Sequence, residues 1–310
     1  MRTHSLCVIA AAAFAAAPLL LTGCGGGASE PRTVTLKSKE TSTPPGPEVV
    51  NDVGKPGTPE AVPAGGFGGW KGQVVFGGAL PQLPPLIKQG DATAKDPAVC
   101  AAMAVPNQKL VGEGGGVANV FIYLARPPAG WQRDAAPTEP AVFDQRGCVF
   151  LPHALLVRVN QDVRVLSDDP IPHNTHTYPV KSTAFNTVIK AGDREGTTFK
   201  YPRAEAEPVS VKCDFHTWMQ AYHLPLDHPF AAVSAEDGTF EIQGLPAGTH
   251  EFSIWHEGVD GAGGYLERKF KVAIQADQTV EQNIDYPAGR FVADADDGAS
   301  AVTLSSLIRK

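Results

Sequence analysis

Short apolar runs, separated by Gly, Pro, Asn and Asp, fill the chain from residue 70 to about residue 286. A helix that covers a core needs apolar residues about every three to four positions over about ten residues or more, and no stretch here keeps that period. Runs of about four to eight residues that alternate or stay apolar predict strands instead. We therefore predict an all-β body. Its predicted strands are 74–76, 117–124, 155–165, 199–201, 209–213, 239–242, 250–255 and 270–274.

Residues of metal-ligand type gather at the end of one predicted strand. Cys213, His216 and Met219 follow one another at intervals of three, and His173 lies upstream in a Pro-His-Asn run. A thiolate and two imidazoles hold copper in a trigonal plane, and a thioether serves as a long, weak axial ligand. Because apolar and polar residues alternate over 209–213, we expect the Cys213 side chain on the buried face. The sequence therefore predicts one copper ion bound by these four side chains.

The same pattern carries a family resemblance. The Pro-His173-Asn run, followed by Cys213-x-x-His216-x-x-Met219, resembles the cupredoxins, and most closely the amicyanins. The resemblance covers residues 145–226 and implies a Greek-key β-sandwich of eight strands with one type 1 copper. It also implies single-electron transfer between redox proteins, such as a c-type cytochrome or a dehydrogenase.

Other polar residues near the pattern are assigned supporting roles. The resemblance implies that Asn174 ties the ligand loops together, which keeps the geometry of the site rigid. His176 lies three residues after His173, and we expect it to be a hydrogen-bonded neighbour, with metal contact as the alternative. His153 is expected to be a capping or core residue. The remaining histidines of this region, His223 and His228, are read as structural, with a second, weaker metal site as the alternative.

A second sandwich is predicted from the C-terminal part of the body. The Asp-Gly pair at 237–238 predicts a hairpin turn, and the Gly-Leu-Pro-Ala-Gly run at 244–248 predicts a second turn. Residues 227–290 resemble the prealbumin-like sandwich of carboxypeptidase regulatory-like domains, which implies a structural or binding module. The opening strand of such modules usually reads Gly-x-Val-x-Phe, and this pattern occurs at 72–76. We therefore expect 67–144 to supply its first strands, with the copper segment inserted into or packed on this sandwich.

The N-terminus reads as a lipoprotein leader. Arg2 precedes an apolar run over 6–21, which has the length and polarity of a secretory signal. The following Leu-Thr-Gly-Cys24 resembles the lipobox of bacterial lipoproteins, with an ordinary signal as the alternative. We predict a signal peptide over 1–23 and a lipid anchor at Cys24, which places the protein in the cell envelope, on the periplasmic face or at the outer membrane. Residues 24–66, rich in Pro, Ser and Thr, predict a disordered tether.

Cysteine counting leads to the same metal ligand. The chain has five cysteines, of which Cys7 lies in the predicted leader and Cys24 is the predicted site of acylation. In an oxidising compartment an odd cysteine indicates an intermolecular bond, a reactive thiol or a metal ligand. Because Cys213 lies inside the ligand pattern, Cys100 and Cys148 are the expected disulfide pair.

Charge and motifs narrow the function. The formal net charge is −7 and the basic residues are scattered, so the sequence does not predict a basic surface for binding nucleic acid. The chain shows no nucleophile elbow, phosphate loop, haem-attachment motif or zinc-protease motif, so we do not expect an enzyme. The alternative to an electron carrier is a copper-binding, delivery or structural module. The chain has only three methionines, and this low number argues against a Met-rich delivery surface. The final stretch, 291–310, has no assigned role.

Overall fold

The protein is described by a computed structural model over residues 65–260 and 263–292, which fall within one compact unit, Gly46–Lys310. The predicted signal peptide, the lipid anchor at Cys24, nearly all of the tether and most of the tail lie outside these residues. Within them the chain is all-β, as predicted. None of the described helices is long and apolar enough to span a membrane.

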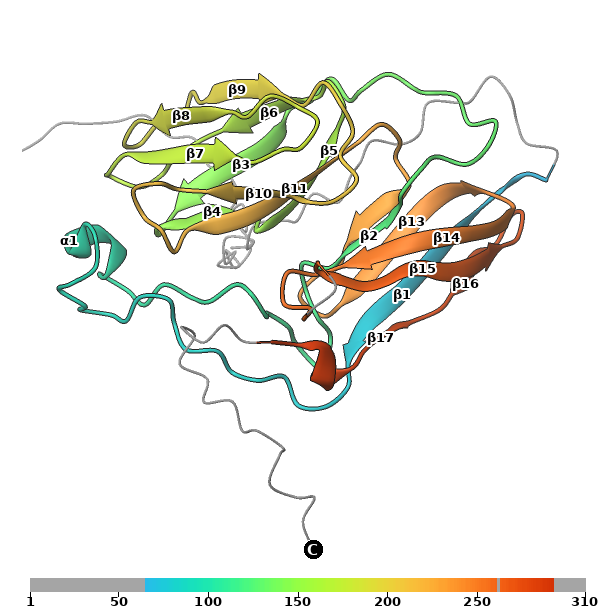
Figure 1. Cartoon of the computed structure of the whole chain (residues 1–310), viewed down its shortest axis with the longest axis horizontal. Coiled ribbons are helices and arrows are strands. Elements are labelled where there is room, and N and C mark those ends of the chain that lie inside the picture. The colour runs from blue at the N-terminus through green and yellow to red at the C-terminus, as the bar shows by residue number, and fades with distance from the viewer. Residues whose placement is uncertain (1–64, 261–262, 293–310) are drawn as a thin grey trace, which may run out of the picture. The chain divides into compact units, whose positions relative to one another are not determined.

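Nine strands form a first sandwich of two sheets (Figure 1). The strand order is β5-β11-β10-β7-β8 in one sheet and β4-β3-β6-β9 in the other. Side chains from both sheets share one core, in which Phe143 and Val163 pack with Val211 and Ala221. The strands are β3 Ala141–Arg146, β4 Val149–Leu151, β5 Ala154–Arg158, β6 Asp162–Val165, β7 His173–Thr177, β8 Asn186–Ile189, β9 Thr197–Lys200, β10 Val209–Lys212 and β11 Gln220–Leu226.

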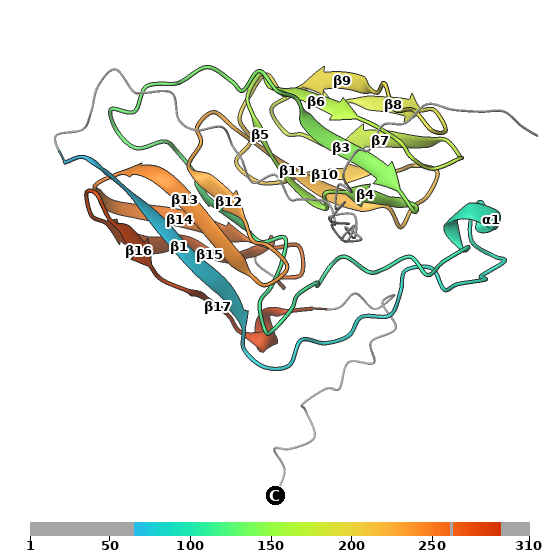
Figure 2. The same ribbon diagram turned by 180° about the vertical axis from the view of Figure 1, so that it is seen from behind.

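The other eight strands form a second sandwich (Figure 2). One sheet has the order β13-β1-β16, with β17 also on β1, and the other has the order β12-β2-β14-β15. Its core is built around Trp70, which is fully buried and whose ring centroid lies 4.8 Å from Phe240 and 4.7 Å from Phe252. The elements are β1 Phe67–Phe76, β2 Phe121–Leu124, β12 Ala231–Val233, β13 Thr239–Pro246, β14 Gly248–Trp255, β15 Tyr265–Ile274, β16 Thr279–Glu281, β17 Ile284–Tyr286 and the 3₁₀ turn η1 Ala288–Arg290.

Chain order shows how the sandwiches are connected. β1 and β2 belong to the second sandwich, β3 to β11 form the first, and the chain returns to the second with β12. The segment predicted to bind copper is therefore inserted between strands of the second sandwich. β3 begins at Ala141, four residues before the predicted start of that segment.

The turn prediction at 237–238 was wrong in one respect. β12 and β13 lie in different sheets, so this turn carries the chain from one sheet to the other and does not close a hairpin. Gly238 has φ of +80°, and a Cβ there would lie 2.5 Å from the Val74 carbonyl oxygen, so glycine is required. The second predicted turn was too long, because β13 runs to Pro246 and β14 begins at Gly248 in the other sheet.

The connection between β1 and β2 leaves its own sandwich and packs on the other. It contains the short helix α1 Pro97–Cys100, and Ile87, Cys100 and Val105 lie in the core of the first sandwich. A disulfide joins Cys100 to Cys148, between β3 and β4. This connection therefore forms part of the wall around the candidate site.

Candidate metal centre

The loop between β10 and β11 presents three of the four predicted ligands. Val209 and Val211 are buried on β10, and Cys213 continues the same face. The Cys213 N–H donates to the Met219 carbonyl at 3.2 Å, and the Met219 N–H donates to the His216 carbonyl at 2.9 Å. The loop therefore closes on itself and holds all three residues near the end of the sheet.

His173 is brought to this loop by strand pairing. It is the first residue of β7, which pairs antiparallel with β10. The two Nδ1 atoms of His173 and His216 lie 2.9 Å apart, and the Cys213 Sγ lies 3.7 Å from the His216 Nδ1. The ligand atoms of these three residues all lie within 4.8 Å of one another. Met219 is buried in the same core cluster as Cys213.

These separations fit a metal ion. With bond lengths of about 2.0 Å to nitrogen and about 2.3 Å to sulfur, a trigonal angle gives a nitrogen–sulfur separation of about 3.7 Å. The 2.9 Å between the two Nδ1 atoms corresponds to an angle of about 90°. A thiolate, two imidazoles and a nearby thioether form the donor set that favours copper among the first-row metals. The donor types therefore fit a copper ion, and the atoms of His173, Cys213 and His216 lie close enough together for one metal ion to bind all three.

The site is dry. His173 and His216 are fully buried, and Cys213 and Met219 are each 1% exposed. Burial of polar groups costs free energy unless they are hydrogen-bonded or bind a metal. This degree of burial is expected for ligands that hold one fixed geometry away from water.

Carboxylates hold the outer nitrogens of both imidazoles. The His173 Nε2 lies 2.9 Å from the Asp169 Oδ2, and the His216 Nε2 lies 3.0 Å from the Asp96 Oδ2. A ring N–H that is donated to a carboxylate leaves the Nδ1 atom for a metal. Sequence reasoning missed both carboxylates. Asp169 lies four residues before His173, which is a weak signal, and no spacing links Asp96 to His216.

The cluster also perturbs ionisation. Burial raises the pKa of the Cys213 thiol, but hydrogen bonds from His173 and His216 outweigh it and lower that pKa to about 6. Burial opposes the charged form of His173, yet its pKa is raised by Asp169 and Cys213. The pKa of Asp169 is lowered, against burial, by His173 and by the N–H groups of Cys148 and Gly147. The cluster therefore favours the thiolate form of Cys213, which is the form that binds metals.

Asn174 and His176 lie beside the ligand loop. The Asn174 amide donates to the Asp214 Oδ2 at 2.8 Å, and its Oδ1 accepts the Asp214 N–H at 2.6 Å. Asn174 thus ties β7 to the loop that carries Cys213. His176 Nδ1 lies 3.1 Å from the Asp214 Oδ2 and 2.9 Å from the Tyr178 hydroxyl, and it belongs to no group of three ligand atoms among the described residues.

The other histidines lie in separate environments. His223 is fully buried among aromatic rings, with its Nδ1 3.0 Å from the Tyr201 hydroxyl, and burial lowers its pKa to about 3. His228 accepts the Phe230 N–H, and burial lowers its pKa to about 4. His153 pairs with Glu257 of the second sandwich. Within the described residues, none of these histidines joins a group of three ligand atoms.

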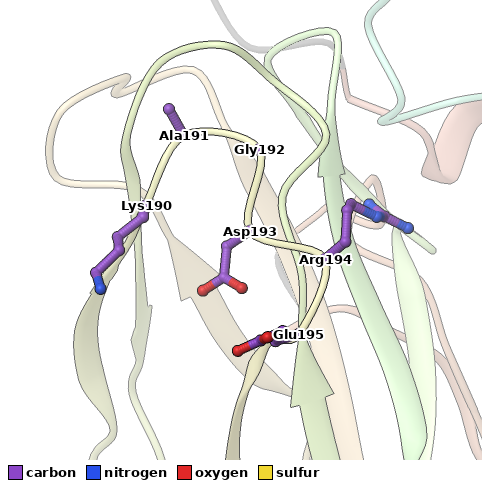
Figure 3. Close-up of a pocket in the computed structure, with 6 residues that line it drawn as sticks. All are labelled: Lys190, Ala191, Gly192, Asp193, Arg194 and Glu195. Carbon is purple, nitrogen blue, oxygen red and sulfur yellow. The ribbon is translucent and has the colours of Figure 1, made fainter.

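A hollow near the site is formed by a single loop between β8 and β9 (Figure 3). Its lining residues are Lys190, Ala191, Gly192, Asp193, Arg194 and Glu195. The Gly192 N–H donates to the Asp169 carbonyl at 2.9 Å, and Arg194 pairs with Asp144 at 2.8 Å. The loop therefore braces the segment that carries Asp169, and it contains none of the candidate ligands.

Comparison with known proteins gives only partial matches. No protein-family model matches the chain, and no curated protein matches it. It is similar to a copper-containing nitrite reductase from Thermus scotoductus SA-01, at 19% identity over 34% of this chain and 26% of the reductase, with a TM-score of 0.26. It is also similar to a purple cupredoxin from Nitrosopumilus maritimus, at 20% identity over 28% of this chain and 99% of the cupredoxin, with a TM-score of 0.24. An amicyanin mutant in the reduced Cu(I) form matches at 16% identity over 35% of this chain and 99% of the amicyanin, with a TM-score of 0.25.

Proposed function

We propose that the protein binds one type 1 copper ion through His173, Cys213, His216 and Met219 and carries single electrons between redox partners. The observation behind this proposal is the convergence of two Nδ1 atoms and one thiol sulfur in a fully buried cluster. Copper bound there supplies a one-electron couple, Cu(II) to Cu(I), so one electron taken from a donor is passed to an acceptor.

The chain's own residues hold the ligands in place and shield them from water. The self-bonded loop from Cys213 to Met219 and the Asn174 tie restrict movement of the ligands. Surrounding core side chains exclude water. A ligand set that moves little between two oxidation states favours fast electron transfer. No proton transfer is needed, so the proposal is a carrier and not an enzyme.

The setting of the copper domain is also a proposal. We infer a lipid anchor at Cys24, attachment to the cell envelope, and a c-type cytochrome or a dehydrogenase as redox partner. The second sandwich would serve as a prealbumin-like structural module that holds the inserted copper domain. The strand order of β1, β2 and β12 supports that role.

A copper-delivery or purely structural role is the alternative. Delivery requires ligands that a partner protein can reach and exchange. Here the four candidate ligands are at most 1% exposed, which favours retention of the metal and therefore a carrier.

A copper titration of the purified chain tests the proposal. Cu(II) is added to the wild type and to Cys213→Ser, and the visible and electron paramagnetic resonance spectra are recorded. An intense blue charge-transfer band with a narrow copper hyperfine splitting, lost in the variant, is the expected result. A colourless protein, or a spectrum that the variant does not change, would overturn the type 1 assignment.

A further inference from the structure

Each candidate imidazole ligand has a carboxylate oxygen at nearly the same distance from its Nε2 atom, on the side of the ring away from Nδ1. The His173 Nε2 to Asp169 Oδ2 separation is 2.9 Å, and the His216 Nε2 to Asp96 Oδ2 separation is 3.0 Å. The two carboxylates come from distant parts of the chain. Asp169 precedes β7, whereas Asp96 lies in the connection between β1 and β2. The matched arrangement therefore results from tertiary structure and not from a local repeat.

Cys148 joins the two carboxylates into one frame. Its N–H donates to the Asp169 Oδ2 at 2.9 Å, and its sulfur forms the disulfide with Cys100. The Cys100 N–H in turn donates to the Asp96 carbonyl at 3.0 Å. The Cys148 carbonyl accepts the Trp218 Nε1–H at 3.1 Å, and the Trp218 ring centroid lies 5.3 Å from His216. Both imidazoles are thus braced through the same residue.

The backbone at Asp96 is shaped for this contact. Asp96 has φ of 51° and ψ of 55°, the left-handed region that side-chain-bearing residues seldom adopt. Its side chain makes no capping hydrogen bond to α1 and is directed to the imidazole instead. The Lys95 ammonium lies 3.9 Å from the same carboxylate oxygen. Asp96 therefore combines a left-handed backbone with a carboxylate that is directed at the His216 ring.

We propose that Asp96 and Asp169 are positioning residues that orient the two copper-binding imidazoles, and that the Cys100–Cys148 disulfide joins them into one rigid frame. This inference rests on the proposed copper function. Each carboxylate accepts an Nε2–H and so fixes the ring and makes the Nδ1 more basic. A more basic ligand favours the higher charge of Cu(II) over Cu(I).

The expected effect is therefore graded and depends on the oxidation state. Removal of a partner that orients a metal-bound histidine typically lowers metal affinity by about 10- to 100-fold. For Asp96→Ala we expect a loss of this size for Cu(II) and a smaller loss for Cu(I). Asp96→Asn keeps an acceptor but removes the charge, so its loss should be smaller. Each tenfold selective loss of Cu(II) affinity corresponds to a rise of about 59 mV in reduction potential.

The experiment compares copper binding and potential across matched variants. Asp96→Ala, Asp96→Asn and Asp169→Asn are measured beside Asp162→Asn, a control carboxylate of similar exposure, 41% against 37% for Asp96. Asp162 pairs with Lys200 and contacts no candidate ligand. Cu(II) and Cu(I) affinities come from competition with chelators, and potentials come from redox titration. Circular dichroism checks that each variant is folded.

A metal-free readout separates the two proposals. Nitrogen NMR of the apoprotein should show the His216 Nε2–H protected in the wild type and exposed to exchange in Asp96→Ala. Wild type that binds no copper but shows this protection would overturn the proposed function while the positioning role stands. Blue wild type with unchanged affinity, potential and His216 signal in the Asp96 variants would overturn the positioning role alone.

Discussion

The buried histidine cluster of the first sandwich differs from a single buried histidine of the second. In the first sandwich, His173, His216 and Cys213 lie within one connected cluster whose outer atoms are bound by carboxylates. In the second, His256 is also buried, but its Nδ1 contacts only the Tyr286 hydroxyl and the Gly258 N–H, and its Nε2 has no hydrogen-bond partner among the described residues. Burial of an imidazole is therefore no sign of a site by itself. Convergence of ligand atoms is the informative feature.

Ionisation shows the same difference. Burial lowers the pKa of His256 to about 4, because it outweighs the opposing effect of the Glu257 carboxylate. The pKa of His173 is raised instead, since Asp169 and Cys213 outweigh burial. His256 is thus buried as a neutral side chain, as His223 is in the first sandwich, whereas charged neighbours stabilise the protonated form of His173. Four predictions test how far this separation of roles extends.

The largest expected effect is on the core of the second sandwich. Trp70→Ala should lower the free energy of unfolding by about 3–5 kcal/mol, because it removes a fully buried ring that packs on Phe240, Phe252 and Phe270. Denaturant unfolding measures the loss, and copper titration is performed on the folded variant. Unchanged copper affinity is expected. A parallel loss of copper binding would show that the second sandwich shapes the metal centre directly.

Removal of the disulfide should act on the other sandwich. Cys100→Ser with Cys148→Ser is expected to cost about 2–4 kcal/mol of stability. Amide hydrogen exchange should report the loss around β3, β4 and α1 and leave β1 and β14 protected. Equal loss of protection in both sandwiches would contradict the assignment of this bond to the first sandwich.

Acid should destabilise the metal-free protein through the neutral histidines. The native pKa of His228 is lowered to about 4 and that of His223 to about 3, from about 6.5 in the unfolded chain. Between these values the unfolded state binds more protons, so stability falls as pH drops from about 6.5 toward 4. The total loss is on the order of a few kcal/mol. Denaturant unfolding at a series of pH values measures it.

A variant isolates the contribution of one histidine. His228→Asn keeps an acceptor for the Phe230 N–H but does not titrate. Its stability should therefore depend less steeply on pH than that of the wild type. An identical slope would show that His228 is not protonated on unfolding in this range.

The sequence predicted the convergence of His173, Cys213 and His216 better than it predicted the surroundings of these side chains. The spacing of Cys213, His216 and Met219 is local, and a strand followed by a loop places them together. The Cys100–Cys148 pair followed from a count of cysteines and is present as a disulfide. These features depend on a few chemical rules that can be read along the chain.

Features that depend on tertiary structure were missed. Asp96 contacts His216 only because the connection between β1 and β2 packs on the inserted sandwich. No local sequence pattern predicts the course of this connection. The turn at 237–238 has a hairpin sequence, yet the chain changes sheet there, since strand partners are chosen by core packing. Short strands such as β4 and β16 carry too few residues for a periodic signal.

The smallest predicted effect concerns the tie beside the ligand loop. Asn174→Ala removes two hydrogen bonds to Asp214 and should cost about 1–3 kcal/mol, because the Asp214 N–H loses its partner. The control is Asn186→Ala, whose side chain also contacts Asn174 and Asp214 but bonds no backbone group of the loop. Copper hyperfine lines should broaden in Asn174→Ala as the Cys213 loop takes several conformations, and stay narrow in Asn186→Ala. Equal line widths in the two variants would mean that the backbone hydrogen bonds between Cys213 and Met219 are sufficient to hold the ligands. The first sandwich would then not need the Asn174 side chain to keep its site rigid.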